Sequence, residues 1–126
     1  MSDPTDPGGP RGPHHGIDYI EITVSDMARA KRFYGEAFGW RFTEYAPSYV
    51  GFVDGARGER EAGGLTLGEV VRGGPLVVLH SRDLEATEAA VRAAGGEIVK
   101  PIFDFPGGRR FELEDPAGNR LAVWSS

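Results

Sequence analysis

The sequence contains no cysteine among its 126 residues. Disulfide bonds and thiol chemistry are therefore excluded, and the composition fits a reducing compartment. No apolar stretch approaches the roughly 20 residues that span a bilayer, and the N-terminal region has no apolar core like that of a secretory signal. We therefore expect a soluble, cytoplasmic protein without a membrane partner.

Basic residues are also in short supply. Lysine and arginine together number 14 against 19 aspartates and glutamates, which gives a net charge of −5, and no basic run stands out. Because neutralisation of phosphates supplies most of the affinity for nucleic acids, no nucleic-acid partner is expected. Hydrophobic residues make up 40% of the chain, which is enough for one domain with its own core.

Residues 1–16 differ in composition from the rest of the chain. A proline recurs at every third position among several glycines, at Pro4, Pro7, Pro10 and Pro13. Such a segment favours extended, polyproline-like conformations and does not pack. We expect a flexible tail over 1–16, with His14 and His15 outside any ligand set, and a single domain over 17–126. A proline motif that binds a partner domain is the alternative.

The domain carries an internal repeat with an offset of 57 residues. Asp26 and Gly39 in the first copy correspond to Asp83 and Gly96 in the second. Each aspartate can cap the N-terminus of a helix by accepting from free amides of the first turn, and each glycine can adopt the left-handed conformation that ends a helix. Two related halves predict a functional site between them.

The apolar residues between these caps have the spacing of one helical face. In the first copy they are Met27, Ala30, Phe33, Tyr34, Ala37 and Phe38. The second copy repeats the stripe with smaller side chains. We expect the two helices to bury Phe33, Tyr34, Phe38, Val91 and Ala94 against the sheets.

The remaining segments favour strands, because they are rich in aromatic and branched residues between turn formers. The expected strands are 17–24, 40–45, 49–53, 63–67, 75–80, 97–102, 109–114 and 121–124. A tight turn at 115–119 precedes the last one. The pattern predicts an α+β domain with two βαβββ modules, at about 17–67 and 75–126.

Three strings of residues carry a resemblance to a known family. They are Asp26…Ala30…Phe33-Tyr34…Phe38-Gly39-Trp40, then Ala94-Gly95-Gly96, and Asp115-Pro116…Gly118-Asn119. Together they resemble the vicinal oxygen chelate superfamily of glyoxalases, bleomycin-resistance proteins and extradiol dioxygenases. A late Phe105-Pro106-Gly107-Gly108 loop is similar to that of a glyoxalase-like subgroup. The resemblance implies two modules around a U-shaped cleft, often paired in a homodimer.

The resemblance also implies positions for a metal, and this chain departs from them. Metal-dependent members place a His or Gln on the first strand of each module and a carboxylate or Gln on the last. Those positions hold Tyr19, Leu76 and Ala122 here. A divalent ion needs several nitrogen or oxygen ligands, which two apolar side chains and a phenol do not supply. We expect no metal and no other cofactor.

Other polar residues are candidates for the site. Strand alternation places Tyr19 and Glu21 on the cleft face. A carboxylate there is either a base or a ligand for a cation, or it is held by a neighbouring arginine for structural reasons. Arg110 shares a strand face with Glu112, and it is the expected partner of Glu21 or of an anionic substrate. The alternative is a solvated strand edge.

His80 ends the fifth expected strand, where it can act as an acid or base near neutral pH or serve only as a hydrogen-bonded rim residue. Several aromatic residues are expected in the core, although they would also suit a planar ligand in the cleft. Trp124 is placed on the cleft face of the last strand. The expected ligand-binding residues are Tyr19, Glu21, Arg110, Glu112 and Trp124, and the catalytic candidates are Glu21 and His80.

Three classes of function remain open. The first is a metal-free protein that binds a small molecule in its cleft. The second is a lyase or isomerase of the glyoxalase type that uses proton transfer by Glu21 and His80 or a relocated metal. The third is a non-catalytic regulatory or partner domain. We favour the first, because loss of the chelate removes the shared chemistry and keeps the cavity, although a fold alone does not establish function.

Overall fold

The structure is a computed structural model that describes residues 14, 15 and 17–126. Apart from His14 and His15, the expected tail lies outside the described residues. Ten elements follow one another along the chain: β1 Ile20–Val24, α1 Met27–Phe38, β2 Arg41–Ala46, β3 Tyr49–Val53, β4 Gly63–Leu67, β5 Val77–His80, α2 Leu84–Ala93, β6 Glu97–Phe105, β7 Gly108–Glu114 and β8 Arg120–Ser125.

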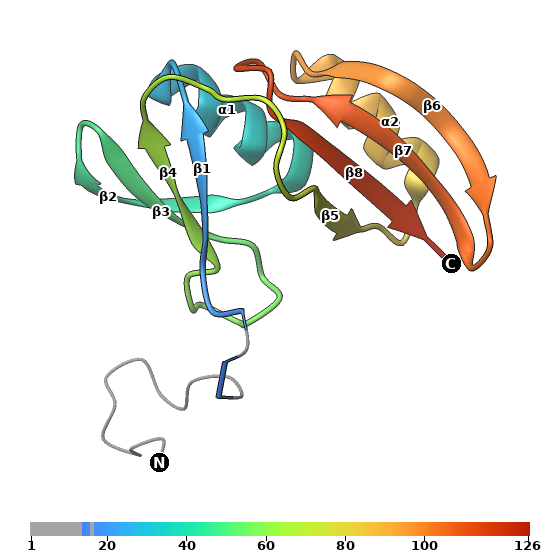
Figure 1. Cartoon of the computed structure of the whole chain (residues 1–126), viewed down its shortest axis with the longest axis horizontal. Coiled ribbons are helices and arrows are strands. Elements are labelled where there is room, and N and C mark those ends of the chain that lie inside the picture. The colour runs from blue at the N-terminus through green and yellow to red at the C-terminus, as the bar shows by residue number, and fades with distance from the viewer. Residues whose placement is uncertain (1–13, 16) are drawn as a thin grey trace.

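The strands form two four-stranded sheets, in the orders β1-β4-β3-β2 and β5-β8-β7-β6. In each sheet the first strand runs parallel to the last, and the other neighbours are antiparallel. The sheets stand next to each other, and the segment between β4 and β5 crosses from one to the other (Figure 1). The prediction of an α+β domain with two βαβββ modules is confirmed.

Helix α1 begins and ends where its caps predict. The Asp26 carboxylate accepts from the backbone N–H of Arg29 at 3.0 Å, and Gly39 adopts a left-handed φ of 74°. These groups satisfy free backbone donors and acceptors at the two ends of the helix. Neither helix of residues 17–126 is long and apolar enough to cross a membrane.

Helix α2 keeps the predicted N-cap but ends earlier than the repeat implies. Asp83 accepts from the N–H of Ala86 at 3.1 Å, as expected. The left-handed residue at its other end is Gly95, with φ 98°, so the assignment of that role to Gly96 was wrong. Gly96 instead packs closely, because a Cβ there would lie 2.8 Å from a ring carbon of Phe33. The second glycine of the repeat thus makes room for an aromatic ring of the first module.

A single hydrophobic core extends through both modules. Phe33, Tyr34 and Val91 are fully buried, as predicted, and Phe38 and Ala94 pack partly buried against the same cluster. Three aromatic rings form a stack in its centre: Tyr34 lies 4.7 Å from Trp40, and Trp40 lies 4.2 Å from Phe52. The helices therefore contribute mainly apolar side chains to the core, while the sheet faces that point away from the helices remain open.

The turn at 115–119 connects the modules through one buried and one partly buried hydrogen bond. Tyr34 of α1 donates its hydroxyl to Asp115 at 2.7 Å. Asn119 donates its side-chain amide to the backbone carbonyl of Thr23 in β1 at 2.8 Å. Gly118 has φ 98°, which confirms the tight turn. The turn therefore fixes the second sheet against the first strand of the other module.

Some strands differ in length from the prediction. The paired parts of the first and fifth strands begin at Ile20 and Val77, because the pairing of β1 with β4 and of β5 with β8 begins there. Strand β6 continues to Phe105, where it pairs with Gly108 across a tight hairpin. The ladder therefore extends past Pro101, which lies on an edge strand with an irregular register, where a missing N–H is tolerated.

Candidate functional site

A cavity of about 730 Å³ lies between the two modules. One wall is β1, a second is the segment that links β4 to β5, and a third is formed by the turn at 118–119 and the start of β8. Its apolar lining includes Ile20, Val71 and Leu76, and its polar lining includes Glu21 and Arg120. Volumes of this order are typical of pockets for small molecules.

Glu21 connects this cavity to a polar cluster on the open face of the first sheet. Ile22 and Val24 face the core, so alternation turns Glu21 to the opposite face. Its carboxylate accepts from the hydroxyl of Tyr49 at 2.9 Å. Glu21 therefore points away from the core, as strand alternation predicts.

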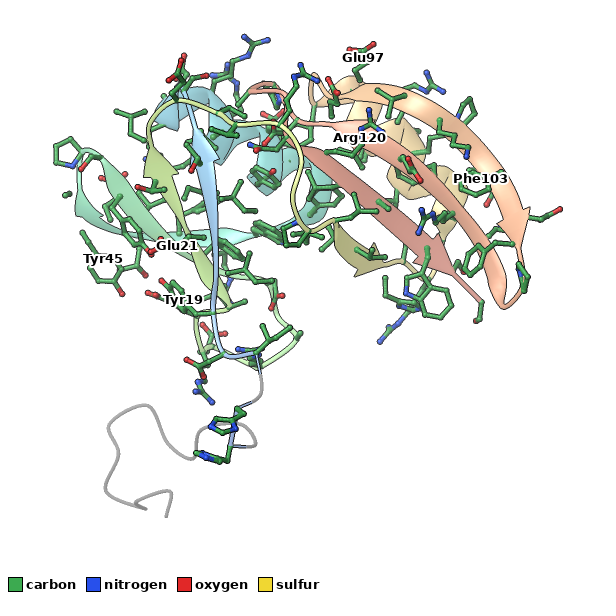
Figure 2. All side chains as sticks on the ribbon, in the orientation of Figure 1. Tyr19, Glu21, Tyr45, Glu97, Phe103 and Arg120 are labelled. Atoms are coloured by element: carbon green, nitrogen blue, oxygen red, sulfur yellow. The ribbon has the colours of Figure 1, made fainter. Side chains whose placement is uncertain are left out.

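We name the group of Tyr19, Glu21, Tyr45, Tyr49 and Glu61 the tyrosine–glutamate cluster. Tyr19 donates to one carboxylate oxygen of Glu61 at 3.0 Å, and Tyr45 donates to the other. The hydroxyls of Tyr49 and Tyr19 are 3.3 Å apart, which joins the two carboxylates through one network. Figure 2 shows three labelled members, Tyr19, Glu21 and Tyr45, gathered at the first sheet.

Two glycines inside the strands make room for this cluster. A Cβ on Gly51 would lie 2.4 Å from carboxylate atoms of Glu61, and a Cβ on Gly64 would lie 2.2 Å from the hydroxyl oxygen of Tyr49. Real side chains do not approach that closely, so both side chains lie flat on bare backbone. The arrangement therefore depends on glycine at two paired positions of β3 and β4.

The phenols of the cluster remain neutral well above neutral pH. Partial burial, then hydrogen bonds with Tyr49 and Glu61, raises the pKa of Tyr19. The hydrogen bond to Glu61 raises the pKa of Tyr45, and burial raises that of Tyr49. The charge of the cluster at neutral pH therefore comes from its two carboxylates.

The open face of the second sheet carries a different arrangement, a chain of alternating ion pairs. Arg72 binds Glu114 at 2.7 Å, Arg120 lies 3.5 Å from Glu114 and 3.4 Å from Glu112, and Arg110 binds Glu112 at 2.7 Å. Arg120 lies on this sheet, away from the labelled tyrosines (Figure 2). Glu112 and Glu114 thus have two arginine partners each.

The structure does not bring Glu21 and Arg110 together, so their expected pairing was wrong. The two residues lie in different sheets. Arg110 is neutralised by Glu112, which is two residues away on the same face of β7, and it also lies over the ring of Phe103 at 5.7 Å. Glu21 is held by the Tyr49 hydroxyl and not by an arginine.

His80 and Trp124 are cross-strand neighbours on β5 and β8, and their rings meet edge to face at 5.2 Å. Trp124 also lies 6.5 Å from the ring of Phe105. Both belong to the second module, and neither contacts Glu21 within the described chain. A joint catalytic role of Glu21 and His80 stays a prediction, and no contact between the two side chains supports it.

The positions at which family resemblance implies a metal hold unsuitable groups. The Tyr19 hydroxyl donates its proton to Glu61, and Leu76 and Ala122 carry no donor atom, with Ala122 fully buried. Over residues 17–126, no three His, Cys, Asp or Glu side chains gather in a way that could hold a metal ion. These residues do not fit the implied metal.

Sequence reasoning missed Tyr45, Tyr49 and Glu61 as partners of the predicted site. Tyr49 was expected in the core by default, and Glu61 was placed in a loop. The available signal was Gly51 and Gly64, because a glycine inside a strand often marks the close approach of another group. Which group approaches depends on the register of β3 and β4 and on the course of the loop before β4.

Comparisons with known proteins agree with this architecture. The family model "Glyoxalase/Bleomycin resistance protein/Dioxygenase superfamily" matches residues 16–123. A glyoxylase-like domain-containing protein of Didymella fabae is 28% identical over 126 residues, covering 87% of this chain and 93% of that protein.

Two solved structures show the same fold. A glyoxalase-related enzyme from Fulvimarina pelagi superposes with a TM-score of 0.75 at 21% identity, covering 90% of this chain and 89% of that one. TnmS3, an antibiotic binding protein from Streptomyces sp. CB03234, superposes with a TM-score of 0.67 at 21% identity, covering 89% and 96%. With the family model matching nearly the whole described chain, this protein belongs to the glyoxalase/bleomycin resistance protein/dioxygenase superfamily.

Proposed function

We propose that this protein binds a small molecule in the cavity between its two modules and does so without a metal ion. The observation that carries the proposal is the cavity of about 730 Å³, which has apolar walls and a few polar groups at its edge. This composition is typical of small-molecule sites. One solved structure with the same fold is described as an antibiotic binding protein, which supports a binding role.

The residues at the implied metal positions support the metal-free part of the proposal. Tyr19 is engaged with Glu61, and Leu76 places a side chain without donor atoms at the cavity wall. Divalent ions bind where several oxygen or nitrogen atoms converge, and these positions offer one phenol. A ligand in this cavity would meet hydrophobic contact at Leu76 in place of a coordinated ion.

The test uses Nile red, a neutral apolar dye whose fluorescence rises in apolar surroundings, in the presence of EDTA. We expect saturable binding by the parent protein. Leu76→Trp, which fills the cavity from its wall, should weaken binding at least about fivefold. Leu67→Trp is the matched control, because Leu67 is also an exposed leucine but does not line the cavity. Equal binding by both variants, or binding that needs an added metal, would contradict the proposal.

We also propose that the protein is a homodimer. β1 and β5 each have one unpaired edge in the single chain, and large apolar side chains are exposed near them, among them Ile17, Val71 and Val78. Two-fold pairing would cover such edges and such surface together. Light scattering at micromolar concentration should give twice the mass of one chain, and a monomeric mass would overturn this proposal.

A further inference from the structure

The tyrosine–glutamate cluster differs from the ion-paired carboxylates Glu112 and Glu114 on the second sheet. Over residues 17–126, no basic nitrogen lies within ion-pair distance of Glu21 or Glu61. On the second sheet, by contrast, Glu112 and Glu114 each bind two arginines. Two adjacent carboxylates without a cation remain a favourable place for one.

The hydrogen bonds of the cluster decide what kind of group it can accept. A phenol has one proton to donate, and Tyr19, Tyr45 and Tyr49 all donate theirs to the two carboxylates. The polar capacity left for a ligand is therefore acceptor capacity alone, from carboxylate and phenol oxygens. A group with N–H donors and a positive charge fits that set, and an anion does not.

The aromatic rings add a second attraction of the same sign. Tyr45 is 61% exposed, and Tyr19 is 38% exposed, so their rings are accessible from the open face. The face of a phenol ring attracts a cation. Gly51 and Gly64 let the side chains of Glu61 and Tyr49 lie directly on the sheet backbone.

The cavity provides an observation independent of these charges. Glu21 belongs both to the cluster and to the wall of the cavity between the modules. A molecule in that cavity therefore meets the cluster on the side of β1, and it meets apolar walls at Val71 and Leu76.

From this juxtaposition we infer that the protein recognises an organic cation: an apolar body with a protonated amine or guanidinium group bound at the tyrosine–glutamate cluster. The inference rests on the proposed small-molecule function and names the chemical class of its ligand. Glu21 and Glu61 neutralise the charge, and the tyrosine oxygens and rings orient the N–H donors.

The test compares three probes of similar size in NMR titrations at pH 7 and constant ionic strength. These are 2-phenylethylamine, which is protonated, 2-phenylethanol, which is neutral, and 3-phenylpropionate, which is anionic. We expect 2-phenylethylamine to shift the backbone amides of β1, β3 and β4 and to bind at least about fivefold more tightly than 2-phenylethanol. Constant ionic strength removes general screening as an explanation. No saturable binding of the anion is expected.

Variants locate the effect. Glu61→Gln and, separately, Glu21→Gln should each reduce the affinity for 2-phenylethylamine about fivefold and leave that for 2-phenylethanol unchanged. Glu59→Gln is the control, because Glu59 lies on the same loop as Glu61 but is paired with Arg41 outside the cluster. Tyr45→Leu should weaken the amine about two- to fivefold through loss of the ring, and its side chain is exposed enough to keep the fold.

Equal affinity for the amine and the alcohol, or equal loss in Glu59→Gln and Glu61→Gln, would overturn the inference. Nile red binding separates this failure from failure of the proposed function. If Nile red still binds and Leu76→Trp blocks its binding, the cavity binds small molecules without discriminating between them by charge. If Nile red does not bind, the proposed function itself fails, and the inference fails with it.

Discussion

Replacing Tyr34 with phenylalanine tests the connection between the modules. The hydroxyl of Tyr34 donates to Asp115 at 2.7 Å, and both residues are buried. The change removes one oxygen and leaves the ring, so the stacking on Trp40 is retained. Only this hydrogen bond between the modules is lost, and the one from Asn119 to Thr23 remains.

The magnitude follows from what Asp115 keeps. A hydrogen bond to a charged group contributes roughly 1.5–3 kcal/mol to stability. Asp115 still accepts from the backbone N–H of Ala117 at 2.9 Å and from the backbone and side-chain N–H groups of Asn119 at 2.8 and 2.9 Å. The carboxylate is therefore not left unsatisfied, and we expect a loss of about 2 kcal/mol in the free energy of unfolding.

The assay is urea unfolding followed by circular dichroism, with parent and variant at equal protein concentration because the proposed dimerisation would link stability to concentration. With a slope of about 2 kcal/mol per molar urea, the midpoint should fall by about 1 M. Tyr45→Phe removes an exposed phenol that also donates to a carboxylate, and it should cost less than about 1 kcal/mol. A loss below about 0.5 kcal/mol in Tyr34→Phe would refute the view that this bond holds the modules together.

Two further predictions concern the tyrosines and the packing glycine. All four tyrosines have a raised pKa, Tyr34 mainly through burial, so native protein at about pH 10.5 should show little of the phenolate absorbance that the urea-unfolded chain shows. A pKa that is raised in the folded state contributes stability that is complete below the unfolded pKa near 10 and is lost as pH rises beyond it. The free energy of unfolding should therefore fall above about pH 10, and it should fall less in Tyr34→Phe. Native protein with half of its phenols ionised at pH 10 would contradict this. Gly96→Ala should lower the free energy of unfolding by about 1–3 kcal/mol, because its Cβ would press on Phe33 and Val91. Gly68→Ala, whose Cβ has its nearest contact at 3.3 Å, should cost less. Equal thermal midpoints for the two variants would refute the packing argument.

Local signals predicted the elements of this fold well. A capping aspartate or a left-handed glycine acts within one helical turn, so Asp26, Gly39 and Asp83 could be assigned from the sequence. Gly95 and Gly96 are adjacent, and only the packing of Phe33 against Gly96 decides which of them ends the helix. The repeat offset was therefore right for the module and wrong by one residue at this cap.

The candidate site was predictable only in part, because its contacts are not local. Alternation along one strand placed Glu21 on the open face. The hydrogen bond of Glu21 with Tyr49 joins two strands, so predicting it requires the order of strands in the sheet. Arg110, by contrast, pairs with Glu112 of its own strand. The expected pair of Glu21 with Arg110 assumed that the open faces of the two sheets meet in one chain, which no periodicity can establish.

The parallel pairing of first and last strands has a consequence for the order of folding. In each module the last three strands form with neighbours nearby in sequence, whereas Ile20 pairs with Gly63, and Val77 pairs with Leu121, only after long loops close. Loop closure of this kind slows folding and comes late. β1 is also an edge strand, so it can separate from the sheet at a lower free energy than global unfolding requires. We therefore expect the strand that carries Glu21 to be the last to be fixed and the first to be released, so that a molecule bound beside it would stabilise the least stable part of its module.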